Sequence, residues 1–189
     1  MKYLYVFVIV FGLLATTSTA TAQYKNWSKL MSFNAGYASI KAEDTGNNLD
    51  GYAFDFTYEQ SNMDGNLAGG IMVTYLAAHD DDSENDRRIN YQSLPIMLQG
   101  KYYFGPAKTR GYLQGGAGIQ FSWVEYLGPN LLLADGDSGV TLGGGVGGYF
   151  FTDEKIFINV AYNLNYLSNS FYRDGLVHLF KLGIGFQND

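Results

Sequence analysis

The feature that most constrains the fold of this chain is an alternation of side-chain character that recurs in eight segments. In each segment every second residue is apolar or aromatic, and the residues between them are small or polar. A β-strand turns successive side chains to opposite faces, so this pattern is typical of strands and not of helices, which repeat every ~3.6 residues. The predicted strands are residues 30–41, 50–61, 66–78, 89–104, 111–124, 138–151, 155–167 and 175–187.

Three features indicate which face of these strands points inward. The predicted connections alternate between short turns and longer polar loops, as they do in outer-membrane barrels. The polar face carries few charges, and these are balanced in sign. Aromatic residues gather near strand ends on the apolar face, as at two membrane interfaces: Tyr37, Tyr52, Tyr58, Tyr75, Tyr102, Phe104, Trp123, Phe150 and Tyr166.

An open sheet edge is not viable in lipid, because every backbone N–H and C=O there needs a partner within the protein. We therefore predict an all-β fold: an eight-stranded antiparallel up-and-down transmembrane β-barrel. Its apolar face contacts lipid and its polar face lines the lumen.

The first residues have the pattern of a secretory signal peptide. Lys2 precedes an apolar run from Leu4 to Leu14, which is too short for a spanning helix, since such a helix needs about 20 residues. Small residues follow, ending in an A-x-A site before Gln23. We predict a signal peptide over residues 1–22, cleaved after Ala22, and one barrel domain over residues 23–189 in the outer membrane.

Charge and composition exclude some classes of function. The chain has 12 basic and 18 acidic residues, and removing Lys2 with the leader leaves 11 − 18 = −7. Nucleic-acid-binding domains are usually basic, so we expect no nucleic-acid partner. The chain has no Cys, which excludes disulfides and thiolate metal sites.

A family resemblance rests on the fourth, fifth and sixth predicted strands. Leu94-Pro95-Ile96-Met97-Leu98 leads to Lys101-Tyr102-Tyr103-Phe104, which ends at Gly105, and two glycine-rich segments follow. The mature chain resembles the porin-family outer-membrane β-barrel domain, related in fold to the transmembrane domain of OmpA and to OmpX. The resemblance implies a barrel without catalytic residues or a cofactor, inserted by the barrel-assembly machinery with periplasmic chaperones. Such barrels often end on an aromatic residue, whereas here Phe186 is followed by Gln187-Asn188-Asp189.

Four charged residues share the predicted lumen face: Asp55, Glu59, Lys101 and Lys181. Their depths along the strands pair Asp55 with Lys181 and Glu59 with Lys101. They could form an ion path, but an eight-stranded barrel has an interior just wide enough for side chains. We therefore favour a structural charge network, packed with the lumen-facing Tyr103, Tyr112 and Tyr149.

The predicted outer loops are strongly acidic. Counted with their flanks they carry 12 acidic and 4 basic residues, or −8, whereas the opposite side carries 5 basic and 4 acidic residues, or +1. We expect contacts with outer-membrane lipids and lipopolysaccharide, with divalent cations bridging to its phosphates. The candidate cation ligands are Asp80, Asp82, Glu84 and Asp86. EF-hand spacing is absent there, and Asp135-Gly136-Asp137-Ser138-Gly139 is equally incomplete, so solvated loops are the simpler interpretation.

Other motifs give little support for catalysis. The glycine-rich segment 143–148 continues into residues that are typical of a strand and not into a helix, so it is not a phosphate-binding loop. His79 lies in an acidic loop, and His178 has no Ser at a suitable spacing in the sequence. We predict a non-enzymatic barrel with a filled lumen and a structural or adhesive role. A narrow porin-like channel is the alternative, and a lipid A-modifying enzyme is a third.

Overall fold

A computed structural model describes residues 27–42, 48–62, 66–82, 87–105, 108–128, 131–152 and 155–188. The predicted signal peptide lies outside these residues. Among them, no helix is long and apolar enough to cross a membrane. The eight strands are β1 (Trp27–Ala42), β2 (Asn48–Asn62), β3 (Leu67–Asp82), β4 (Arg87–Phe104), β5 (Thr109–Gly128), β6 (Leu131–Phe151), β7 (Ile156–Leu167) and β8 (Tyr172–Asn188).

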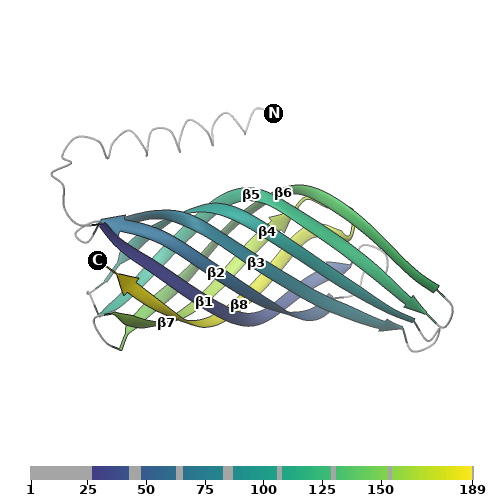
Figure 1. The fold of residues 1–189 in the computed structure, drawn as a ribbon, viewed down its shortest axis with the longest axis horizontal. Coiled ribbons are helices and arrows are strands. Elements are labelled where there is room, and N and C mark those ends of the chain that lie inside the picture. Colours follow the sequence, from purple (N-terminus) through teal and green to yellow (C-terminus); the bar gives the residue numbers. More distant parts are fainter. Residues whose placement is uncertain are drawn as a thin grey trace.

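Consecutive strands pair antiparallel, and β1 pairs with β8, so the sheet closes into a barrel (Figure 1). The predicted fold class is confirmed. We call the end at which β1 begins and β8 ends the inner end, and the opposite end the outer end. The β1–β8 register is continuous from Lys29 opposite Asn188 to Ile40 opposite Val177.

The apolar face points outward along all strands, as predicted. Phe33, Leu98 and Leu182 expose 57%, 69% and 61% of their surface, whereas the lumen-facing Asn163 is fully buried. In water this arrangement would expose a large apolar surface to solvent, whereas in a membrane the lipid covers that surface. Closure of the barrel pairs the backbone groups within the protein, as lipid requires.

The prediction of longer outer loops is wrong. Segments with Asp, Asn and Gly have the composition of loops, but the strands continue through them: β5 reaches Gly128 and β6 starts at Leu131. Their residues stay in register, with Glu125 opposite Ala134, because pairing satisfies backbone groups that a loop would leave to water. The asymmetry lies instead in the strands, since β3 to β6 project beyond the others at the outer end (Figure 1).

The small and polar lumen residues that we predicted form the middle of the lumen, including Asn34, Asp55, Asn159 and Lys181, but the prediction is wrong in the outer half. There the lumen is filled by a buried apolar cluster, the outer plug: Ile40, Leu49, Leu76, Val124, Leu167 and Leu179, with neighbouring small residues and tyrosines. A second cluster, the inner plug, includes Tyr103, Tyr112, Tyr149 and Phe157. Side chains therefore fill the barrel at two levels.

Candidate functional site

The lumen charges form two ion pairs, each of which spans one intervening strand. Lys181 Nζ lies 2.5 Å from Asp55 Oδ2, and both residues are about 95% buried, with 6% and 5% of their surface exposed. Asp55 is on β2 and Lys181 on β8, with β1 between them. Gly36 of β1 is opposite Lys181 and offers no side chain, so the lysine can cross the strand.

The second pair repeats this geometry nearer the inner end. Lys101 Nζ lies 2.8 Å from Glu59 Oε2, with β3 between the two residues. The β3 residues beside them are small: Gly70 is opposite Glu59, and Ala68 is opposite Lys101. A Cβ on Gly70 would come 2.6 Å from Glu59 Cα. These are the pairs that depth along the strands predicts, but each crosses a single strand and not the whole barrel.

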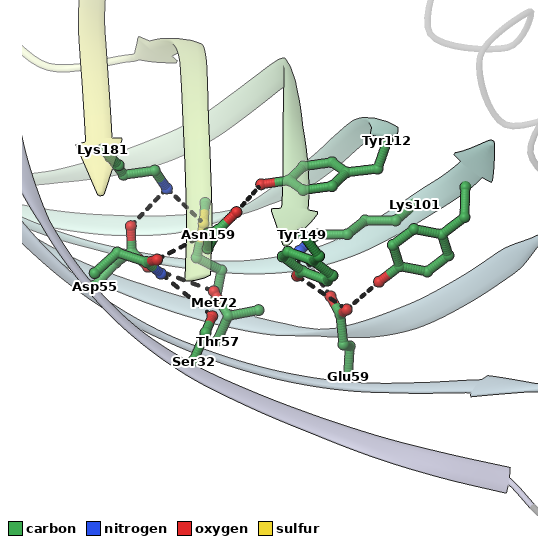
Figure 2. A network of polar contacts seen from close by, with 12 residues as sticks. Ser32, Asp55, Thr57, Glu59, Met72, Lys101, Tyr112, Tyr149, Asn159 and Lys181 are labelled. Atoms are coloured by element: carbon green, nitrogen blue, oxygen red, sulfur yellow. Dashed lines mark hydrogen bonds and ion pairs between the residues drawn. The ribbon is translucent and has the colours of Figure 1, made fainter. Parts of the chain in front are cut away.

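Amide side chains connect the two pairs into one network (Figure 2). Asn34 Nδ2 donates to Asp55 Oδ1 at 2.6 Å, and Asn159 Nδ2 donates to Asn34 Oδ1 at 2.8 Å. The Tyr112 hydroxyl donates to Asn159 Oδ1 at 2.8 Å. The Tyr112 ring centre lies 4.5 Å from Lys101 Nζ, which brings the chain of contacts to the second pair. The sequence pattern places Asn34 and Asn159 on the lumen face but does not reveal that they connect the two ion pairs.

Three tyrosines close the lumen around the inner ion pair. The Tyr103 and Tyr149 hydroxyls both donate to Glu59 Oε1, and Lys101 Nζ donates to the Tyr149 hydroxyl at 2.5 Å. The Tyr112 and Tyr149 ring centres are 4.9 Å apart. Gly147 of β6 is opposite Tyr112, and a Cβ there would come 2.4 Å from the phenol ring, so the glycine makes room for the tyrosine. The charges are thus held by fixed donors and rings.

The segment between β7 and β8 and the first residue of β8 pack against the outer plug. Tyr172 turns into the lumen, where its hydroxyl lies 2.7 Å from Ser93 Oγ. Asn169 Oδ1 accepts from the backbone N–H groups of Phe171 and Tyr172, at 2.9 and 3.0 Å. Asn169 Nδ2 donates to Gln120 Oε1 at 3.3 Å, which ties the segment to β5. These contacts hold the segment over the outer plug.

Asp137 ties the same segment to the projecting part of β6. Its Oδ2 accepts from the Ser170 backbone N–H at 2.9 Å and from the Ser170 hydroxyl at 3.1 Å. These hydrogen bonds, together with the backbone N–H of Ser138, hold the pKa of the Asp137 carboxyl below its usual value. The 135–139 segment, which in sequence has the pattern of an incomplete metal loop, is therefore part of a strand, and Asp137 acts as an acceptor between elements.

The acidic cation candidates remain a prediction. Asp80 and Asp82 belong to β3, while Glu84 and Asp86 lie outside the described residues. Within the described ranges, no group of three or more His, Asp or Glu side chains could hold a metal ion. His178 lies on the face of the barrel that points away from the lumen, where its Nδ1 is 2.8 Å from the Tyr162 hydroxyl. Barrel closure places Ser39 of β1 opposite His178, a neighbour that sequence spacing could not identify.

Comparison with known proteins identifies the family. The model of the outer membrane protein beta-barrel domain matches residues 9–187. The chain belongs to this family. It is thus an outer-membrane β-barrel protein, as its outward-facing apolar surface requires. None of the curated proteins matches it significantly.

Solved structures of outer-membrane proteins share the fold of this family member at low sequence identity. Neisserial surface protein A has 13% identity and a TM-score of 0.64, covering 86% of this chain and 99% of its own. A major outer membrane protein of Thermus thermophilus has 13% identity and a TM-score of 0.63, covering 85% and 99%. The attachment invasion locus protein of Yersinia pestis, Ail, crystallised with a heparin analogue, has 14% identity and a TM-score of 0.55, covering 86% and 99%. At these identities the likeness concerns the fold.

Proposed function

We propose that this protein is a non-enzymatic outer-membrane barrel with a closed lumen, which acts through its outer surface in a structural or adhesive role. The observation that carries the proposal is the filled lumen. Leu76, Val124 and Leu179 of the outer plug are fully buried, and Tyr149 of the inner plug is 1% exposed. Solute would have to displace both plugs and a hydrogen-bonded ion-pair network to pass.

The projecting sheet supports a role in surface contacts. β6 pairs with β5 along almost its whole length but pairs with β7 only from Thr141 to Phe151. The outer part of β6, which begins at Leu131, therefore projects beyond β7 and presents the edge that faces away from β5. A strand edge offers backbone donors and acceptors to an extended segment of another protein. Asp135 and Asp137 accept from the N–H groups of Gly136 and Ser138, so these two donors are already engaged within β6.

Charge indicates the chemistry of such a partner. The outer segments carry −8 by sequence count, so a partner with basic residues is favoured. Ail is an attachment protein by name and was crystallised with the heparin analogue sucrose octasulfate. A sulfated ligand of that kind is disfavoured here by repulsion. Divalent cations at Asp80, Asp82, Glu84 and Asp86 would instead bridge the acidic strands to lipopolysaccharide phosphates.

The route to the membrane forms part of the proposal. The signal peptide, residues 1–22, is cleaved after Ala22, and the barrel-assembly machinery inserts residues 23–189 with the help of periplasmic chaperones. No cofactor and no nucleic acid take part.

A narrow pore is the second candidate, favoured by the polar layer in the middle of the lumen. With its amide oxygen directed at Lys181, Asn163 accepts from Lys181 Nζ at 3.3 Å and from Gln114 Nε2 at 2.6 Å. Such a layer could bind ions if both plugs opened.

Single-channel recording in planar bilayers tests the closed lumen, with Tyr172→Ala as a variant that removes part of the outer closure. We expect no steady conductance from the parent, and steady conductance from it would favour the pore. Binding of cells that carry the protein to a surface coated with a basic peptide tests the adhesive role. Binding equal to that on an acidic peptide would contradict that role.

A further inference from the structure

A cavity of about 160 Å³ opens where the barrel closes, in the outer part of the β1–β8 seam. The register of the two strands is regular up to Ile40 opposite Val177, and the next pair is Ala42 opposite Tyr172. The extra β8 residues form a bulge. Asp174 and Gly175 in this bulge have φ of 60° and 62°, a left-handed conformation in which Asp, Asn and Gly are the best tolerated residues. The bulge separates the strands locally and leaves the cavity.

The cavity lies on the lipid-facing side of the wall, at the level of the outer interface. Five of its lining residues are on the outward parity: Ser39 and Lys41 of β1, Asn48 of β2, and Leu176 and His178 of β8. Towards the inner end, the outward residues of the same strands are apolar, including Ala35, Phe180 and Leu182. The change from apolar to polar marks the depth at which lipid headgroups lie.

The lining combines a cation, an anion and neutral donors. Lys41 supplies an ammonium group, Asp174 a carboxylate, and Ser39 and Asn48 a hydroxyl and an amide. His178 also lines the cavity, and its Nδ1 lies 2.8 Å from the Tyr162 hydroxyl, which leaves Nε2 as its second polar atom. The formal charge of the lining with neutral histidine is +1 − 1 = 0.

A ligand with the same separation of charge complements this lining. A phosphate group would accept from the donors around Lys41, and a primary ammonium group would donate to Asp174. A lone phosphate would meet the Asp174 carboxylate without compensation, and a quaternary ammonium group would offer it no hydrogen bond. The cavity, of about 160 Å³, has room for a phosphate group and a short amine.

We propose that the β1–β8 seam cavity binds a phosphoethanolamine headgroup, with Lys41 on the phosphate and Asp174 on the ammonium. The exposed Phe180, which is the next outward-facing residue after His178 towards the inner end, then lies on the side of the acyl chains. The site is independent of the closed lumen and of any adhesive partner. It gives the protein a selective contact with the lipids around it.

Native mass spectrometry of the folded protein in detergent tests this site. The probes are phosphatidylethanolamine, phosphatidylglycerol and phosphatidylcholine with the same acyl chains. We expect the ethanolamine lipid to be retained several-fold more than the other two. Lys41→Gln should lower its retention about tenfold, the change expected for loss of one charge-assisted hydrogen bond. Asp174→Asn keeps a residue suited to the left-handed backbone and should abolish the preference for ethanolamine over glycerol.

Lys29→Gln is the matched control, because Lys29 is an exposed lysine of the same strand at the inner end. Heat-dependent mobility in gels checks that each variant is folded. Soluble glycerophosphoethanolamine distinguishes the source of the headgroup: displacement of the lipid shows that the headgroup suffices, and failure to displace it shows that the membrane lipid is the ligand. Retention that is the same for the three headgroups, or unchanged in Lys41→Gln and Asp174→Asn, would overturn the proposal.

Discussion

The ion pair between Asp55 and Lys181 offers a direct test of how the lumen is held. Lys181→Met keeps much of the length of the side chain but removes the ammonium group. The Asp55 carboxylate is then left buried, with Asn34 Nδ2 at 2.6 Å and Thr57 Oγ1 at 3.5 Å as its remaining donors. Removing one partner of a buried pair typically costs about 3–5 kcal/mol. Because one good hydrogen bond remains, we expect a loss near 3 kcal/mol, the lower end of that range.

The double change, Lys181→Met with Asp55→Leu, should cost less than the single one. It removes both charges, and its main penalty is that Asn34 Nδ2 loses its acceptor in a buried site. An unsatisfied buried donor costs about 1–3 kcal/mol. We therefore expect the double variant to be about 1–2 kcal/mol more stable than Lys181→Met, with a coupling energy of about 2 kcal/mol or more between the two positions.

Urea unfolding of the refolded protein in detergent measures each free energy of unfolding. Asp55→Leu alone completes the double-mutant cycle. It leaves Lys181 Nζ with the Asn163 amide oxygen at 3.3 Å and Met72 Sδ at 3.6 Å. Lys155→Met is the control, since Lys155 is exposed just before β7 and should change stability by less than about 0.5 kcal/mol. Losses that add without coupling would refute the reasoning, because they would mean that neither charge depends on the other.

Three further predictions concern other parts of the chain. N-terminal sequencing of the membrane-extracted protein should begin at Gln23, and a mature chain that begins at Met1 would contradict cleavage after Ala22. Leu182→Arg, on the lipid-facing side of β8, should cost about 2–4 kcal/mol in lipid bilayers, and unfolding like that of the parent would contradict the facing of the strands. Asp137 has a lowered pKa when folded, so its stabilisation is full above the ordinary pKa of Asp and is lost as the pH falls through the folded value. The protection factor of the Ser170 amide, which is the intrinsic exchange rate divided by the observed rate at the same pH, should accordingly fall on acidification and in Asp137→Ala at neutral pH. A protection factor unaffected by either change would mean that Asp137 does not hold the segment.

The order of polar and apolar residues along the chain determined the fold class of this protein. Alternation with a period of two defines strands, and apolar residues such as Leu98 and Leu182 on one face require lipid outside them. Depth along the strands was also sufficient to pair Asp55 with Lys181 and Glu59 with Lys101. Both conclusions follow from local periodicity and strand direction, which a sequence contains.

Only the tertiary structure decided how the lumen is filled and where the barrel closes. Leu76, Val124 and Leu179 lie on the face that elsewhere is polar, and they pack together only because distant strands enclose the same space. The β1–β8 register likewise joins the first strand to the last, which places Ser39 opposite His178 and creates the bulge at Asp174. No local pattern encodes contacts between residues so far apart, since they depend on closure and shear of the whole sheet.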